Sequence, residues 1–210
     1  TRQGRSEAFA IIIATGTQSK KLLVSGETEF LGRGVSYCTV CDGPLFRGKV
    51  AAVIGSEDEA FEDALYLSNI AREVVIMTNK EGIEATKTLV DKCTEKRIEI
   101  LKAGVKTILG DGYVKSIVVS DLRSHKDTEV IVDGVFISIG GVPMTSVVKK
   151  AGVAVDERGC IRVDRQQATN IEGVFAAGDC TCGGMQMVTA AGEGAMAAIQ
   201  AYRYVRNVKM

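Results

Sequence analysis

The segment between residues 50 and 77 constrains the fold of this 210-residue chain more strongly than any other. It joins an apolar run at 50–54, a turn at Gly55, a stretch with helical spacing of apolar side chains at 58–71, and a second apolar run at 74–77. Continuous apolar runs of this length are typical of strands that are buried on both faces. Two such strands joined through a helix pair in parallel by a right-handed crossover, so the sequence predicts an α/β fold.

Similar patterns extend this prediction to the rest of the chain. Apolar runs predict buried strands at 9–14, 135–139 and 174–177, each followed closely by glycine. Residues 17–49 show little periodicity and contain many glycines, so we expect loop and linker there, with one short segment around a cysteine pair. The remaining pattern predicts helices at 83–97 and 187–205 and short strands at 98–101, 107–109, 114–119, 129–132 and 161–163.

The charge balance argues against several classes of protein. Lysine and arginine together number 26, as do aspartate and glutamate, so no positive excess would attract nucleic acid or an anionic membrane. No apolar run approaches the roughly 18 residues of a membrane-spanning helix, and the first residues lack the apolar core of a signal peptide. We therefore expect a cytoplasmic protein that binds neither nucleic acid nor membrane.

The single histidine, His125, removes further mechanisms. A zinc site with two histidines is excluded, and a Ser-His-Asp site would have to use this residue. His125 lies in a polar stretch at 122–127 that is typical of a hairpin turn, so we expect it to be a solvated loop residue.

The sharpest chemical feature is the pair Cys38 and Cys41, separated by two residues. This spacing lets the two sulfurs close a small disulfide or share a metal. We favour a redox dithiol, with two buried free thiols as the plainer alternative. Asp42 follows at once, and a carboxylate beside a dithiol can act as a general acid for a leaving thiolate, although it also suits a turn before Gly43.

The other four cysteines decide whether a metal is expected. A zinc or iron–sulfur site would need two more ligands beside the first pair, and Cys180 and Cys182 could supply them only with an atypical spacing. A metal site is therefore the weaker alternative, and we predict none. Cys93 and Cys160 are isolated in the sequence, and we expect each to be a small buried or half-buried residue.

A second feature follows the strand at 50–54, where a dinucleotide fingerprint would lie. Gly55, Ser56 and Glu57 occupy the first three places of the pattern G-x-G-x-x-G/A, with glutamate at the second glycine. A glycine there lets the backbone approach a pyrophosphate, whereas the carboxylate of Glu57 would face it. After the next strand, residues 78–80 offer neither an arginine pair for a 2′-phosphate nor an acidic residue for a ribose. The frame of a nicotinamide site is predicted, with its chemistry impaired.

A third feature follows the strand at 174–177. Gly178 and Asp179 stand at its carboxyl end, where a carboxylate can accept hydrogen bonds from a ribose or another polyol. Residues 189–194 then open a helix whose first amides could face an anionic ring edge or a carbonyl oxygen. Each of these two signals also has an ordinary structural explanation of equal weight.

Together these residues resemble the low-molecular-weight thioredoxin reductases. The resemblance rests on residues 32–43 around the cysteine pair, the turn at Thr15 and Gly16, and the segments 173–179 and 188–194. It implies two Rossmann-like, three-layer βα lobes, in which an FAD domain is interrupted by a nicotinamide-type domain that carries the dithiol. We accordingly expect residues 1–36 and 143–210 to form a partial FAD-binding domain and residues 37–142 to form the nicotinamide-type domain.

The resemblance also implies roles for individual residues. Cys38 attacks the disulfide of a thioredoxin-like partner, Cys41 forms a charge-transfer thiolate nearer the flavin, and Asp42 is the general acid and base. Asp179 binds the ribityl–phosphate region of FAD, and Gln186 with the helix at 189–191 contacts the isoalloxazine. The expected cofactor-binding residues are Thr15, Gly16, Gly178, Asp179, Gln186, Met187, Val188 and Thr189, with Gly55, Ser56 and Glu57 at the nicotinamide-type site. Relatives of this kind are usually homodimers.

The sequence departs from the family pattern in three places. The N-terminal FAD fingerprint is absent, Glu57 and residues 78–80 make NADPH a doubtful donor, and no arginine precedes Gln186. Relatives without the nicotinamide signatures take electrons from ferredoxin or a deazaflavin, and we expect such a donor here. Two alternatives stay open, namely a catalytically incomplete fragment or binding module that keeps the fold, and a flavin-dependent dithiol oxidase.

Overall fold

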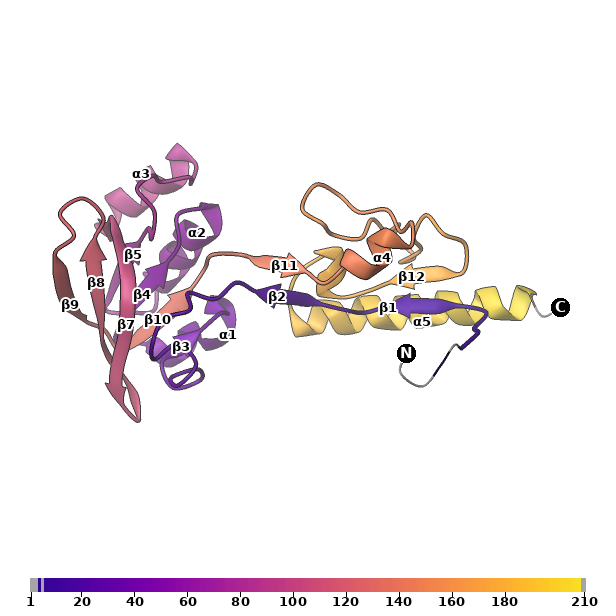
Figure 1. The fold of residues 1–210 in the computed structure, drawn as a ribbon, viewed down its shortest axis with the longest axis horizontal. Helices are drawn as coiled ribbons and strands as arrows, with labels where there is room; N and C mark the ends of the chain where they lie inside the picture. Colours follow the sequence, from indigo (N-terminus) through magenta and orange to yellow (C-terminus); the bar gives the residue numbers. More distant parts are fainter. Residues whose placement is uncertain (1–3, 5, 209–210) are drawn as a thin grey trace. The chain divides into compact units, whose positions relative to one another are not determined.

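The computed structural model describes Gly4 and residues 6–208, which fold into two compact units (Figure 1). One unit combines the described residues up to Gln18 with those from Gly141 onward, and the other runs from Ser19 to Gly140. The second unit thus begins earlier than the expected boundary after residue 36 and ends at 140 rather than 142. The reason is that Phe30 and Val35 are buried in its core.

A parallel sheet forms the middle of the second unit. Its strand order is β3–β10–β4–β5–β6, and all neighbouring strands pair in parallel, as the strand–helix–strand pattern predicts. All five residues of β4 are buried, which explains its unbroken apolar sequence. The strands span Val35–Ser36 (β3), Gly134–Ile137 (β10), Val50–Ile54 (β4), Glu73–Met77 (β5) and Glu99–Leu101 (β6).

Helices cover one face of this sheet. Helices α2 (Asp58–Leu67) and α3 (Lys87–Glu95) bury Phe61 and Cys93 against Val53 and Phe136 of the strands. Helix α2 stops four residues earlier than the apolar spacing predicts. The hydroxyl of Ser68 donates to the carbonyl of Leu65, and the chain turns there instead of continuing the helix.

An antiparallel meander covers the other face, completing three layers (Figure 1). It consists of β7 (Ala103–Asp111), β8 (Tyr113–Asp121) and β9 (Asp127–Ile131), which overlap the short strands predicted at 107–109, 114–119 and 129–132. Alternate residues of β4 serve the two layers, because Ala52 and Ile54 face the meander while Ala51 and Val53 face the helices. His125 lies in the turn between β8 and β9 with φ 55°, as expected of a turn residue.

The segment expected to be mostly loop contains several short elements. They are β2 (Thr17–Ser19), β3, helix α1 (Thr39–Asp42) and the 3₁₀ helix η1 (Gly43–Phe46). Elements of two to four residues carry too few positions for a hydrophobic period to register, which is why the sequence did not reveal them. β2 pairs with β11 (Gly141–Pro143) where the chain passes between the two units.

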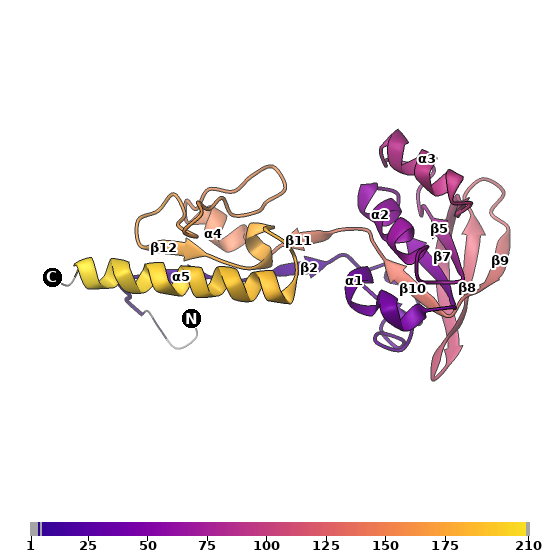
Figure 2. The ribbon, with the colours of Figure 1, turned by 180° about the vertical axis from the view of Figure 1, so that it is seen from behind.

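In the other unit, β1 (Ile11–Ile13) pairs in parallel with β12 (Val174–Ala176). Helix α5 (Met187–Val208) runs along these strands (Figure 2), and α4 (Ser146–Lys150) and η2 (Asp179–Thr181) complete the named elements. A strand forms within the predicted segment 9–14, but Ile11 and Ile12 are exposed. Among the described residues β1 pairs with β12 alone, so less of it is covered than in a wider sheet. The strand predicted at 161–163 is wrong, because Ile161 makes only an isolated bridge.

No helix within the described part of the chain has both the length and the apolar character needed to cross a membrane.

Candidate active site

The cysteine pair closes in a disulfide, as its spacing predicts. Cys38 and Cys41 are bonded across a Cα–Cα distance of 5.3 Å at the start of helix α1. Cys38 caps this helix, since its Sγ accepts a hydrogen bond from the amide of Cys41 at 3.2 Å. Cys41 is exposed and Cys38 is half-buried, so the disulfide lies at the surface of its unit.

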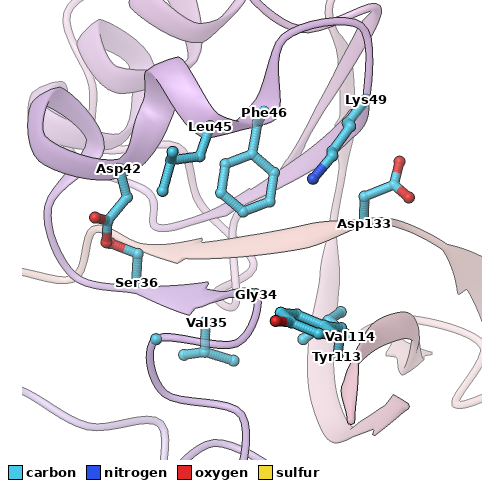
Figure 3. Close-up of a pocket in the computed structure, with 11 residues that line it drawn as sticks. Gly34, Val35, Ser36, Asp42, Leu45, Phe46, Lys49, Tyr113, Val114 and Asp133 are labelled. Carbon is cyan, nitrogen blue, oxygen red and sulfur yellow. The ribbon is translucent and has the colours of Figure 1, made fainter. Parts of the chain in front are cut away.

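The carboxylate beside the disulfide is held by a buried hydroxyl. Ser36, on β3, donates its Oγ–H to Oδ2 of Asp42 at 2.6 Å (Figure 3). The hydroxyl oxygen of Ser36 also accepts a hydrogen bond from the amide of Cys38 at 3.0 Å. Ser36 is buried and Asp42 is half-buried, so this contact is sheltered from solvent. One hydroxyl therefore links the carboxylate to the backbone of the first cysteine.

A second hydrogen-bond network holds Thr39, the first of the two residues between the cysteines. The carboxylate of Asp63, on α2, accepts hydrogen bonds from the hydroxyls of Thr39 and Ser138, the latter at 2.5 Å. Burial raises the pKa of Asp63, and the two hydroxyl bonds oppose that rise without cancelling it. Thr39 is buried, so the turn that carries the disulfide is anchored to the helical layer.

The residue before Cys38 is anchored as well. The hydroxyl of Tyr37 donates to the buried carboxylate of Glu27, which also accepts the amides of Leu22 and Leu23 at 2.9 and 2.7 Å. Burial opposes ionisation of Glu27, but these bonds outweigh it and hold the pKa of Glu27 below its ordinary value. Burial raises the pKa of Tyr37, and the hydrogen bond to the carboxylate of Glu27 raises it further. The disulfide thus sits on a segment fixed from several sides.

A pocket of about 360 Å³ opens beside Asp42 (Figure 3). Ser36 and Asp42 line one part of it, and Phe46 and Tyr113 contribute aromatic surface. Around the disulfide, the side chains of Val40 and Leu45 are 57% and 68% exposed. Apolar side chains exposed next to a disulfide offer a surface on which another protein can dock.

A second disulfide joins Cys160 to Cys182, with a Cα–Cα distance of 5.7 Å. Cys160 is buried, as expected, but its bond to Cys182 was not predicted. Cys180 stays a free buried thiol, as does Cys93. No sequence signal marks this pairing, because its partners lie 22 residues apart. Within the described residues, no group of three or more histidine, cysteine or acidic side chains could hold a metal.

The residues expected to contact FAD lie at one end of the β1–β12 pair. The register matches Ile13 to Ala176, so the turns at Thr15–Gly16 and Gly178–Asp179 leave neighbouring strands at the same end. The carboxylate of Asp179 is half-buried and has no hydrogen-bond partner among the described residues, which suits an acceptor for ligand hydroxyls. Gly178 is held by its amide, which donates to Glu193 of α5 at 2.7 Å.

The start of α5 presents apolar side chains next to these turns. Met187 and Val188 are 89% and 78% exposed, as would suit contact with a flat aromatic ring. The hydroxyl of Thr189 donates to the carbonyl of Gln186 at 2.8 Å and so closes the first turn of the helix. The residues present fit FAD. Glu193 was missed in the sequence because its contact with Gly178 depends on how α5 packs.

The nicotinamide-type site has the expected backbone and an unsuitable charge. A side chain on Gly55 would lie 2.2 Å from the carbonyl oxygen of Ser138, so only glycine fits. Glu57 follows in extended conformation at the start of α2. Lys80 Nζ lies 3.0 Å from both carboxylate oxygens of Glu84 and 3.8 Å from Glu57.

Glu57, Lys80 and Lys20 line a pocket of about 200 Å³ at the carboxyl ends of β4, β5 and β10. The contact with Glu84, ahead of that with Glu57, raises the pKa of Lys80. A pyrophosphate at the turn after β4 would meet the carboxylate of Glu57.

The chain belongs to the pyridine nucleotide-disulphide oxidoreductase family, whose model matches residues 2–194. It is 42% identical over 209 residues to a thioredoxin reductase of Listeria monocytogenes, a match that covers 97% of this chain and 65% of that relative. Solved structures of thioredoxin reductases from Streptococcus pyogenes and Giardia duodenalis superpose with TM-scores of 0.89 and 0.87 at 35% and 37% identity. Each match covers 94% of this chain and 66% of the other. The predicted fold class and the resemblance are confirmed.

Proposed function

We propose that this chain is the larger part of a flavoprotein disulfide reductase of the thioredoxin reductase type. Electrons pass from FAD to the Cys38–Cys41 disulfide and then to the disulfide of a thioredoxin-like protein. The observation that carries the proposal is the surface disulfide with the half-buried carboxylate of Asp42 held beside it. The names of the related proteins support the same chemistry.

The exchange step can be written with the residues of this chain. FAD, when bound and reduced by the electron donor, would supply the two electrons that, with two protons, convert the disulfide to a dithiol. The Cys38 thiolate attacks one sulfur of the partner's disulfide, so that a mixed disulfide forms and the partner's S–S bond breaks. The departing sulfur takes a proton from the carboxyl of Asp42. The Cys41 thiolate then attacks Cys38, which restores the original disulfide and releases the second partner sulfur, protonated from solvent.

We assign the FAD contacts to the turns that follow β1 and β12 and to the start of α5. Asp179 would accept hydrogen bonds from hydroxyl groups of the cofactor, and the exposed Met187 and Val188 would lie against its ring. The chain spans 65% of the length of the first two curated relatives, so the FAD site is proposed for the whole protein. Titration of the chain with FAD, followed by its visible absorption, measures how much of the site these residues provide.

The electron donor is proposed to be something other than NADPH, such as reduced ferredoxin or another non-nicotinamide carrier. The support is the carboxylate of Glu57 at the pyrophosphate position and the capture of Lys80 by Glu84. NADPH fluorescence should be unchanged by the chain. A Glu57→Gly and Glu84→Arg double variant should bind NADPH measurably better, and strong binding to the unaltered chain would contradict the proposal.

The central experiment is stoichiometric transfer from the pre-reduced chain to an oxidised thioredoxin. The chain should return to the disulfide form as the thioredoxin becomes reduced, and Cys38→Ser should abolish the reaction. Cys41→Ser should instead accumulate a mixed disulfide at Cys38, because the resolving thiol is gone. Cys93→Ser, which removes a buried free thiol on the helical face of the same unit, is the matched control and should behave like the parent. Full transfer by Cys38→Ser would refute the proposal.

Two further expectations rest on the resemblance alone. A homodimer predicts twice the chain mass in light scattering, and a cytoplasmic location predicts that fractionated cells hold the protein with their cytosolic markers. Both are proposals for the whole protein.

A further inference from the structure

We infer that Ser36 is a positioning residue that aims Asp42 at the sulfur leaving in disulfide exchange. The inference rests on the proposed function and assigns a role to a residue outside the C-x-x-C-Asp segment. It starts from one hydroxyl with three contacts. Ser36 Oγ lies 2.6 Å from Asp42 Oδ2, 3.0 Å from the amide nitrogen of Cys38 and 3.3 Å from its carbonyl oxygen.

The direction of these bonds follows from counting protons. A serine hydroxyl has one proton to donate and two lone pairs to accept. The amide of Cys38 can only donate, so it occupies a lone pair of Ser36. The proton of the hydroxyl then goes to the carboxylate of Asp42, the shorter of its two acceptor contacts. Ser36 therefore couples the position of the carboxylate to the backbone of the nucleophile.

Burial makes this coupling rigid. Ser36 is 4% exposed and belongs to β3, which pairs with β10 at one edge of the parallel sheet. A hydroxyl fixed by a sheet can hold a carboxylate in one orientation, whereas a water molecule in its place would exchange. Hydrogen bonds to charged groups are also stronger than neutral ones. One carboxylate oxygen is thereby occupied, and Oδ1 of Asp42 is left to exchange a proton with the departing sulfur.

The role makes a prediction that a purely structural role does not. A leaving thiol that is stable as a thiolate needs no proton, whereas an alkyl thiol leaves poorly without one. Losing Ser36 should therefore slow the reduction of an alkyl disulfide and spare an aromatic disulfide with an acidic leaving thiol. Damage to the fold of the site would slow both.

The test uses the pre-reduced chain in single-turnover reactions with hydroxyethyl disulfide and with 5,5′-dithiobis(2-nitrobenzoic acid). Background from other thiols is subtracted with Cys38→Ser. We expect Ser36→Ala to reduce the alkyl disulfide about tenfold more slowly and to leave the aromatic one within about twofold. Ser36→Thr, which keeps the hydroxyl, should recover most of the lost rate.

Two comparison variants separate the possible failures. Asp42→Asn should show the same dependence on the leaving group, and adding Ser36→Ala to it should cause little further loss, since Ser36 acts through Asp42. Ser116→Ala is the control for the loss of a buried hydroxyl. The hydroxyl of Ser116, on the meander, donates to the carboxylate of Glu129 at 2.5 Å, and its removal should change neither rate.

The outcomes are distinct. Equal slowing of both probes by Ser36→Ala, or no slowing while Asp42→Asn is impaired, overturns the inference and leaves the proposed function standing. An Asp42→Asn chain that reduces both probes normally overturns the acid role in the proposed function itself.

Discussion

Removing the Cys160–Cys182 disulfide should destabilise the unit that contains β1, β12 and α5 by about 3 kcal/mol. The crosslink spans 22 residues, and closing a loop of this length removes that much conformational freedom from the unfolded chain. It joins the turn before Ile161 to the residue that follows η2, and these two segments also share the hydrogen bond from the Ile161 amide to the Cys180 carbonyl at 2.8 Å and a common core cluster. Without the disulfide, the segment that carries Gly178 and Asp179 loses a covalent restraint and keeps its hydrogen bonds to Glu193 and Thr17.

The assay is equilibrium unfolding in urea, followed by circular dichroism under oxidising conditions. A Cys160→Ala and Cys182→Ala double variant is compared with the parent chain and with Cys180→Ala. The latter removes a buried free thiol from the same segment and should cost about 1 kcal/mol, because only packing and a weak S–H bond are lost. Dithiothreitol should then destabilise the parent more than the double variant. The reasoning is refuted if the double variant and Cys180→Ala unfold at the same urea concentration.

Three further predictions concern the unit that carries the redox disulfide. Gly134→Ala should destabilise it by more than 1 kcal/mol in urea unfolding, because the new Cβ would lie 2.1 Å from the ring of Phe46; an unchanged midpoint would contradict the packing. Phe136→Ala, at a fully buried position, should cost about 3–5 kcal/mol in the same assay, and a loss below about 1 kcal/mol would show that the site collapses freely. Because the pKa of Asp63 is raised above its ordinary 3.8, folding favours its protonated form, and its contribution is fully present below that value and lost as pH rises through the raised pKa. The stability of the parent relative to Asp63→Asn should therefore fall over this range, and a relative gain with rising pH would reverse the sign of the argument.

The parts of the fold that were predictable are those encoded by neighbouring residues. The strands β4 and β5 can be recognised in the sequence because positions buried on both faces of a sheet must be apolar. The disulfide of Cys38 and Cys41 follows from a spacing of two residues, since the sulfurs of one helical turn lie within bonding reach.

The parts that were not predictable depend on contacts between distant residues. The carboxylate of Asp63 meets Ser138 from 75 residues away, and Cys160 meets Cys182 across 22 residues. Nothing local marks either pair. The exposure of Ile11 was also unpredictable, because an apolar strand is buried only where another element covers it.

The sequence by itself therefore determined the class of fold, the redox pair and the carboxylate next to it, since each is written in adjacent positions. Tertiary structure decided what those groups can do. It brought the Ser36 hydroxyl to Asp42, paired Lys80 with Glu84 beside Glu57, and left the Asp179 carboxylate without a partner among the described residues. The physical reason is that hydrogen bonds and ion pairs act over a few ångströms in space, whatever the separation along the chain.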